Sequence, residues 1–236
     1  MSELQEMVTP MRDCLFILSE EKGRLRRFMR DVNSALSVKG KILDFIAGRR
    51  TNLPDMIRET ASLYEACREL VQAKSEELER RRTELVQYSG RKRGELLQYM
   101  SQPEEPKESK PQEKIASLED KVKASAIQYN RLLQKDRIQD TRQKLSDVNY
   151  LFDAINKLCF AFNYAQDKLS RHEDYIKATA ESVCCVIELK SLGKKLGSLS
   201  DRIRRTMSSG YNAFDESVRQ IKGAIDYADT PRLLLK

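Results

Sequence analysis

The chain has 236 residues, of which 33% are charged and 40% are apolar, with nine glycines, six prolines and no tryptophan. This is the profile of long helices rather than of a sheet protein rich in turns, and the length fits one domain, or one elongated domain with a tail. No run of about 18 apolar residues occurs, so we expect no transmembrane helix.

The formal net charge of +7 is unevenly distributed along the chain. Residues 22–50, 80–100 and 190–205 carry +7, +4 and +5, which leaves −9 for the remainder. Concentrated positive charge favours an anionic partner, either a membrane or a nucleic acid, although a basic face of a long helix is also often plain solvated surface. The five cysteines are an odd number, and four of them stand among apolar helical residues, which favours a reduced, cytoplasmic setting.

The first half of the sequence predicts two helices and a loop. Apolar residues at helical spacing indicate a helix over about 11–47, with Gly48 as its stop. A second helix over about 53–100 is capped by Thr51 or Asn52 and has Pro54 in its first turn. Residues 101–111, with three prolines, predict a solvated tip loop between two antiparallel helices.

The third predicted helix, over about 112–190, is the element around which the chain is organised. It contains neither proline nor glycine, and at about 1.5 Å per residue it would be roughly 115 Å long, so it must pair with other helices. One apolar stripe follows its central part at alternating steps of four and three, with a single polar member, Thr141. We expect the core or the interface of a dimer to include Leu145, Val148, Phe152, Ile155, Cys159 and Phe162.

The sequence after residue 190 predicts an additional C-terminal helix and a short tail. Gly193 and Gly197 mark a hinge, and a further apolar stripe runs from Leu199 to Ile225. The fold class is therefore all-α, an elongated antiparallel bundle of three to four long helices.

No combination of residues in the sequence favours catalysis. The single histidine, His172, has no Cys or Ser partner in the sequence that would support catalysis. The adjacent Cys184 and Cys185 lack a second pair at zinc-ligand spacing, so packing accounts better for the two cysteines. We expect no enzyme activity, no cofactor, no metal and no small-molecule substrate.

The order of these features resembles a BAR domain, the crescent-shaped helical dimer of amphiphysins and endophilins that binds curved membranes. Three stretches carry the resemblance: EKGRLRR from Glu21 with VKG at Val38, RRRTELVQYSGRKRGELLQY over 80–99, and QEKIASLEDKVKASAIQYNRLLQ over 112–134. The resemblance implies a BAR-like domain over 1–190, a homodimer, and a cytoplasmic protein that is peripheral at membranes and acts in membrane trafficking such as endocytosis.

The resemblance also implies a function, the sensing or generation of curvature by basic residues that contact anionic phospholipid. The residues expected to bind lipid are Arg80, Arg81, Arg82, Arg91, Lys92, Arg93, Lys107, Lys110 and Lys114. A secondary basic patch for lipid or for a protein partner of the C-terminal helix comprises Lys194, Lys195, Arg202, Arg204 and Arg205. Two alternatives stay open: a cytoskeletal or scaffold coiled coil whose basic patches bind proteins, and a helical protein that binds nucleic acid.

Overall fold

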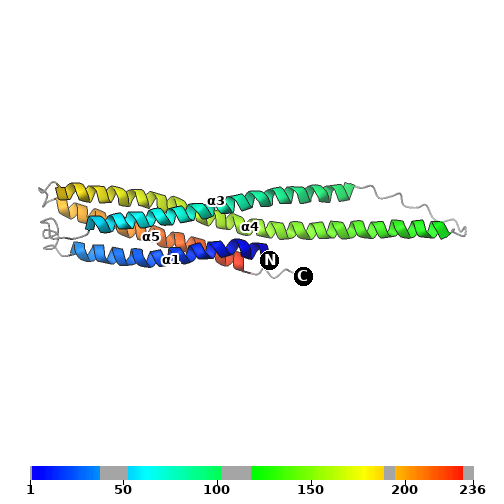
Figure 1. Cartoon of the computed structure of the whole chain (residues 1–236), viewed down its shortest axis with the longest axis horizontal. Helices are drawn as coiled ribbons and strands as arrows, with labels where there is room; N and C mark the ends of the chain where they lie inside the picture. Colours follow the sequence, from blue (N-terminus) through cyan, green and yellow to red (C-terminus); the bar gives the residue numbers. More distant parts are fainter. Residues whose placement is uncertain (1, 38–52, 102–117, 189–194, 231–236) are drawn as a thin grey trace. The chain divides into compact units, whose positions relative to one another are not determined.

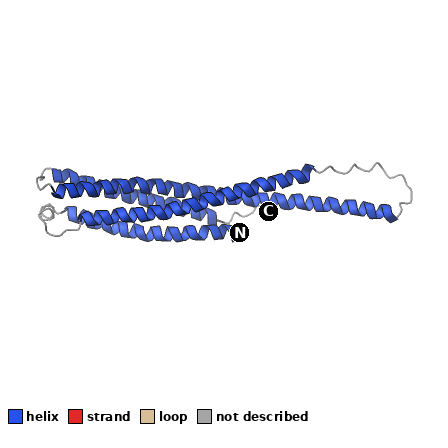
Figure 2. Ribbon diagram, turned by 45° about the horizontal axis from the view of Figure 1, so that its top comes forward, coloured by secondary structure: helices blue, strands red, loops and turns tan. Residues whose placement is uncertain are grey.

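The computed structural model describes residues 2–37, 53–101, 118–188 and 195–230. Within these ranges the chain forms helices and no strand (Figure 1, Figure 2). The helices are α1 (Ser2–Ser37), α3 (Leu53–Ser101), α4 (Leu118–Glu188) and α5 (Lys195–Asp229). The all-α fold class and the number of long helices are confirmed for the described part of the chain.

The helices form two compact units. Residues 1–79 and 154–236 make up the first, to which all four described helices contribute, and residues 80–153 make up the second. We refer to the first as the four-helix bundle and to the second, which holds the later part of α3 and the earlier part of α4, as the helix pair.

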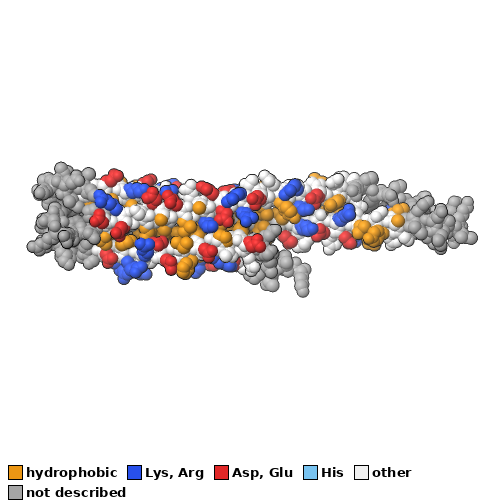
Figure 3. Space-filling model, in the orientation of Figure 1, with side chains coloured by type: hydrophobic (Ala, Val, Ile, Leu, Met, Phe, Trp, Pro, Cys, Tyr) orange, Lys and Arg blue, Asp and Glu red, His pale blue; other side chains and the backbone are white. Residues whose placement is uncertain are grey.

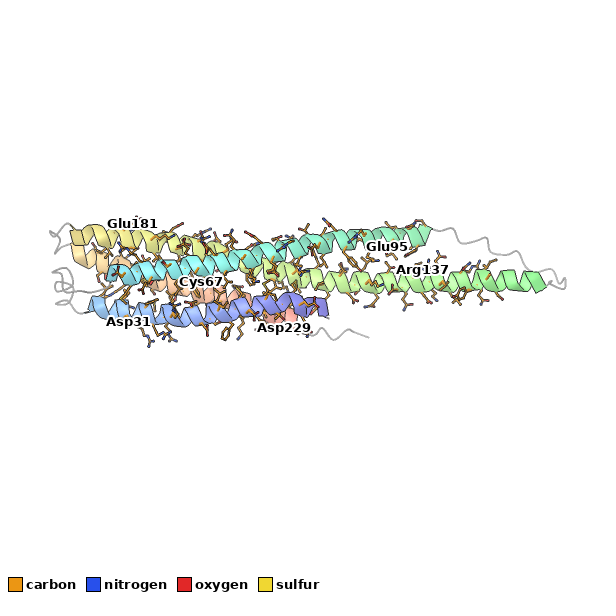
Figure 4. The ribbon with its side chains drawn as sticks, viewed as in Figure 1. Asp31, Cys67, Glu95, Arg137, Glu181 and Asp229 are labelled. Carbon is orange, nitrogen blue, oxygen red and sulfur yellow. The ribbon has the colours of Figure 1, made fainter. Side chains whose placement is uncertain are left out.

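Side-chain contacts fix the direction of each helix in the four-helix bundle. Arg12 near the start of α1 pairs with Asp229 at the end of α5 at 2.6 Å, and Lys22 pairs with Asp215. As residue numbers rise along α1 they fall along α5, so the two helices are antiparallel (Figure 1, Figure 4).

The same reasoning applies to α3 and α4. Arg68 pairs with Glu173 at 2.7 Å, and Ser75 hydrogen-bonds to Asn163. Between α4 and α5, Thr179 contacts Thr206. His172 of α4 also contacts Ser209 of α5, so residue numbers fall along α5 as they rise along α4. Consecutive described helices therefore run in opposite directions.

The predicted apolar stripes form the interior. On α4, Ile155, Cys159 and Phe162 are at most 4% exposed in the bundle, whereas Val148 is buried in the helix pair. The remaining members, Leu145 and Phe152, are half-buried. The four buried members are therefore core residues of the chain itself, and burial of each large apolar side chain stabilises the fold by about 1.5–3 kcal/mol.

The one polar member of that stripe, Thr141, is also buried. Its hydroxyl donates to the carbonyl of Arg137, one turn earlier, at 2.8 Å. The hydrogen bond satisfies the only group that makes threonine unfavourable in an apolar position, so the stripe stays continuous.

The predicted start of the first helix is wrong, because α1 begins at Ser2 and includes Pro10. A proline inside a helix removes one backbone hydrogen bond and costs about 3 kcal/mol. Met7 and Val8, on the turn before it, are 7% and 0% exposed, and their burial offsets that cost. The expected helical residues 38–47, the tip loop beyond Ser101 and the start of the third helix at 112–117 lie outside the described residues.

The C-terminal helix is part of the bundle. Along α5 the predicted stripe is buried at Ile203, Met207, Phe214, Val218 and Ile221, among others. These side chains complete the interior of the same unit that α1 belongs to.

Candidate functional site

The predicted basic residues of α3 lie in the helix pair. An α-helix turns by about 100° per residue, so positions eleven apart return to nearly the same side. Arg80 and Arg91 therefore share one side of α3, Arg81 and Lys92 a second, and Arg82 and Arg93 a third. Lys107, Lys110 and Lys114 lie outside the described residues.

The side that carries Lys92 faces α4. Leu85, Tyr88, Lys92, Leu96 and Tyr99 are half-buried along it, and Gln134 of α4 donates from Nε2 to the carbonyl of Tyr99 at 2.8 Å. Lys92 Nζ donates to Glu95 at 2.7 Å, which raises its pKa, and lies 5.7 Å from the ring centre of Tyr88. Lys92 is therefore engaged in packing rather than presented outward.

The antiparallel course of the two helices decides which of their flanks lie on the same side of the helix pair. Lys92 is half-buried against α4, and Leu145 is half-buried against α3. Because both helices are right-handed, the residues just before these two, Arg91 and Lys144, turn to the same side of the pair. The pKa of Lys144 is raised mainly by its hydrogen bond to Asp140, and Lys92 and Tyr88 of α3 also act on it, as expected for neighbouring helices.

The opposite side follows from residue spacing. Residues two apart point to opposite sides of a helix, so Arg93 lies opposite Arg91 and Arg142 lies opposite Lys144. Arg82 shares the Arg93 side, and Arg131 and Lys135 share the Arg142 side. We call this side of the helix pair the basic face: Arg82 and Arg93 of α3, with Arg131, Lys135 and Arg142 of α4.

The other side carries both signs of charge. Arg80, Glu84, Arg91 and Glu95 of α3 lie there with Arg137, Asp140 and Lys144 of α4, and we call it the mixed face. Figure 4 labels one residue of each helix on it, Glu95 and Arg137.

The basic face is exposed and carries five cations and one carboxylate. All five cationic side chains are exposed, and Arg93, Lys135 and Arg142 have no ion-pair partner in the described part of the chain. Asp153, eleven residues after Arg142, lies on this side at the end of the unit. The other acidic residues of 80–101 and 125–153 lie on the mixed face or on the outward side of α4, at Glu84, Glu95, Asp136, Asp140 and Asp147.

Apolar side chains border the basic face on α3. Val86, Leu97 and Met100 are 52%, 65% and 56% exposed. They stand within one turn or two of Arg82 and Arg93, on the outward side of the helix. Exposed apolar groups beside a basic face are typical of helices that lie at a membrane interface.

The secondary basic patch is divided between different roles. Arg202 is exposed, whereas Arg204 donates from Nη2 to the carbonyl of Leu36 at 2.9 Å, near the end of α1. Arg205 donates from Nε to the carbonyl of Asp201 at 3.3 Å. Arg204 therefore satisfies an end carbonyl of α1 and interacts favourably with its dipole. Lys194 and the side chain of Lys195 lie outside the described part.

A buried ionic cluster joins α3 to α4 in the four-helix bundle. Glu173 is 5% exposed and accepts hydrogen bonds from Arg68 Nε at 2.7 Å and Lys177 Nζ at 2.6 Å. Burial by itself raises the pKa of Glu173, but the hydrogen bonds from Lys177 and Arg68 outweigh it and the pKa is lowered. Glu173 is therefore held as a carboxylate, which fixes the pairing of the two helices.

The histidine contacts a serine that sequence spacing did not indicate. His172 Nδ1 lies 2.9 Å from the carbonyl of Lys168 and must donate to it, and Nε2 lies 3.2 Å from Ser209 Oγ on α5. A hydroxyl beside an imidazole is the start of a nucleophilic site. Stabilisation of an oxyanion needs free backbone donors, and the amides here are committed to helical hydrogen bonds. The contact joins α4 to α5.

The described residues offer no cluster of three or more metal-binding side chains. Among the described helices, none combines the length and the apolar character that crossing a bilayer requires.

Arg131, Lys135 and Arg142 were not among the residues predicted to bind lipid. Arg131 and Arg142 are eleven residues apart in the sequence, as are Arg82 and Arg93. This shared spacing indicates a common basic side only once the pairing and register of α3 and α4 are known. Comparison of the chain with known protein families, curated proteins and solved structures finds no match.

Proposed function

We propose that the protein is a non-enzymatic, peripheral membrane-binding protein that contacts anionic phospholipid through the basic face of its helix pair. The observation that carries the proposal is the separation of charge between the two sides of this unit. One side presents five exposed cations with a single carboxylate, Asp153, at its end, whereas the other has its cations interspersed with carboxylates.

The size of the face suits a lipid surface. Arg82 and Arg93 are about 16 Å apart along α3, as are Arg131 and Arg142 along α4. Each cation near an anionic leaflet contributes about 1 kcal/mol, screened by salt. Five of them supply about 5 kcal/mol, enough for reversible attachment, and a second copy of the chain in the same contact would double that amount.

The bordering apolar residues favour a membrane over a nucleic acid. Leu97 and Met100 have no role in contacting phosphates, whereas at a bilayer they can enter the region between headgroups and acyl chains beside Arg93. The proposal keeps Arg82 and Arg93 from the predicted lipid-binding set. A single flat surface cannot contact them and the opposite row of Arg80 and Arg91 together.

Three further parts of the proposal rest on the resemblance to BAR domains. They are association into a homodimer, preference for curved membranes, and a cytoplasmic location at trafficking membranes. Dependence of binding on vesicle size tests the second of these directly.

The deciding experiment compares two charge-neutralised variants that differ only in the side altered. The test variant is Arg93→Gln with Lys135→Gln and Arg142→Gln, on the basic face. The control is Arg80→Gln with Arg91→Gln and Lys144→Gln, on the mixed face, which removes the same charge. Both are measured by co-sedimentation with small and large vesicles containing anionic lipid, at low and moderate salt.

Loss of three cations from the contact should weaken vesicle binding by about 3 kcal/mol, roughly a hundredfold. We expect this loss for the basic-face variant and a much smaller effect for the control. Equal weakening of both variants would show that only net charge matters and would refute the assignment of the face. Binding of RNA or of an acidic protein with no vesicle binding would select one of the alternatives.

A further inference from the structure

The most basic stretch of the sequence, residues 22–50, has no part in the proposed function. Its described portion is the later part of α1. There Lys22 pairs with Asp215 of α5, whereas Arg26 and Arg30 are exposed and have no ion-pair partner in the described part of the chain. Figure 3 shows Lys and Arg side chains gathered at the lower edge of the four-helix bundle, where Figure 1 draws α1.

Arg26 and Arg30 lie on the side of α1 that faces α5. Arg26 follows Lys22 by one helical turn, and Arg30 follows Arg12 by five complete turns. Both Lys22 and Arg12 form ion pairs with α5. The next carboxylate of α1, Asp31, comes nine residues after Lys22 and therefore points to the opposite side of the helix. The two free arginines thus stand along α5 with no carboxylate of their own helix beside them.

Two contacts show which part of α5 runs beside them. Lys22 pairs with Asp215, and the carbonyl of Leu36 accepts a hydrogen bond from Nη2 of Arg204 at 2.9 Å. The stretch of α1 between its two contact residues therefore runs beside the stretch of α5 between theirs. In the sequence, that stretch of α5 contains no carboxylate until Asp215 itself.

This stretch of α5 presents hydrogen-bond donors toward α1 and toward solvent. Ser208 and Asn212 follow Arg204 by one and two turns, so they lie on nearly the same side. Both are exposed, and their side chains make no hydrogen bond within the described residues. Ser208 is level with Arg30. Asn212 is level with Arg26. We call these five residues the α1–α5 donor cluster.

We infer that the α1–α5 donor cluster binds a compound with two neighbouring phosphate groups, one at each level. Arginine donates two parallel hydrogen bonds to a phosphate, and serine hydroxyls and asparagine amides are common further donors to it. A phosphate ester presents three acceptor oxygens, so one group can accept from an arginine of α1 and from Ser208 or Asn212 of α5 together. A carboxylate has two oxygens, and a bidentate arginine uses both. The two levels are one turn, about 6 Å, apart.

The cluster is unfavourable for the fold while no anion is bound. Arg26 and Arg30 are like charges one turn apart, an arrangement that destabilises a helix. Arg204 adds a third guanidinium on the neighbouring helix. A bound polyphosphate neutralises this repulsion, so these arginines serve a ligand rather than the stability of the bundle. The site is in the four-helix bundle and does not depend on the basic face of the helix pair.

The test measures binding of inorganic tripolyphosphate to the full chain by isothermal titration calorimetry. It contains no lipid, so its failure and a failure of membrane binding are separate results. The test variant is Arg26→Gln with Arg30→Gln. The control is Arg24→Gln with Arg202→Gln, which removes the same charge from the same two helices. Arg24 and Arg202 stand two residues before Arg26 and Arg204 and therefore point away from the cluster.

We expect the native chain and the control to bind tripolyphosphate alike and the test variant to bind about a hundredfold more weakly, because each charge-assisted hydrogen bond contributes about tenfold or more. Ser208→Ala removes no charge and should weaken binding about fivefold. Citrate, an anion built from carboxylates, should bind much more weakly than tripolyphosphate. The helicity of all variants should be unchanged.

A second arm identifies the source of the phosphates. Vesicles containing phosphatidylinositol bisphosphate are compared with phosphatidylserine vesicles of equal charge, for the test variant and for its control. A loss confined to the test variant and to the bisphosphate vesicles shows that the phosphates belong to a lipid headgroup. Equal weakening by both variants, equal affinity for citrate, or no effect of the test variant on tripolyphosphate and on bisphosphate vesicles would overturn the inference.

Discussion

The packing of Tyr64 against Gly210 in the bundle interior yields a prediction that can be worked through quantitatively. Tyr64 is fully buried with its ring edge-on to Phe214, at 5.6 Å between centres. Its hydroxyl has no hydrogen-bond partner among the described residues. A Cβ added at Gly210 of α5 would lie 2.9 Å from that oxygen and 3.5 Å from the ring carbon that bears it.

The free energies of the single variants follow from these distances. Gly210→Ala gains about 1 kcal/mol of helix propensity but forces a buried ring to move, which costs about 1–3 kcal/mol. The net effect should be destabilisation by about 1 kcal/mol. Tyr64→Phe removes a buried hydroxyl that lacks a partner and should stabilise the fold by about 1 kcal/mol.

The double variant separates the two contributions. With phenylalanine at position 64 the nearest atom to the new Cβ is a ring carbon at ordinary contact distance, so Gly210→Ala should now stabilise by about 1 kcal/mol. This gives a coupling energy of about 2 kcal/mol. The control is Gly223→Ala in the same helix, whose Cβ would meet nothing within 4 Å, and it should stabilise by about 1 kcal/mol in both backgrounds.

Urea unfolding followed by circular dichroism measures all the variants. If Gly210→Ala changes the free energy of unfolding equally with tyrosine and with phenylalanine at position 64, the Tyr64 hydroxyl does not restrict a side chain at position 210.

Two further predictions concern the dependence of stability on pH. Burial raises the pKa of Cys14 and of Cys67 to about 12, so between about pH 9 and pH 12 the folded state holds protons that the unfolded state has lost, and stability falls as pH rises. Each thiol should approach a loss of about 1.4 kcal/mol per pH unit, and Cys67→Ala should show a correspondingly shallower slope in urea unfolding above pH 9; identical slopes would contradict the burial of this thiol. The pKa of Glu173 is lower in the folded state than in the unfolded state. Its ionised carboxylate therefore stabilises the fold at pH values above the ordinary glutamate pKa, and this stabilisation is lost as the pH falls through the folded-state pKa. Glu173→Gln should therefore destabilise by about 2 kcal/mol at pH 7 and by progressively less as the pH falls below the ordinary range for glutamate. The same change at Glu181, which is exposed on the same helix, should have little effect at any pH, and a difference for Glu173 that stays constant with pH would argue against ionic stabilisation.

The helices were predictable because each signal for them is local. Apolar spacing at Ile155, Cys159 and Phe162 required only the helical period, and the burial of all three is confirmed. The start of α1 was not predictable from the same rules, because Pro10 ends a helix locally and only the distant contacts of Met7 and Val8 reverse that outcome.

Pairing between helices was beyond the reach of the sequence for the same reason. Nothing near Arg204 indicates that it contacts the carbonyl of Leu36, and nothing near His172 indicates Ser209. The uneven charge of the helix pair depends on which flanks of α3 and α4 lie together, and that is known only once the antiparallel pairing of the two helices is known.

The ion pair between Arg12 and Asp229 has a consequence for how the chain folds. Its two residues are 217 positions apart in the sequence. The bundle that they help to close is built from two segments, one before residue 80 and one after residue 153. During synthesis α1 is made first, yet the helix that covers one of its sides is made last among the described elements. For most of translation the apolar side of α1 stays open to other chains, the condition under which unfinished helical proteins aggregate or exchange helices. The rate of refolding should be governed by the arrival of α5, a long-range step that is slow for a protein made of helices.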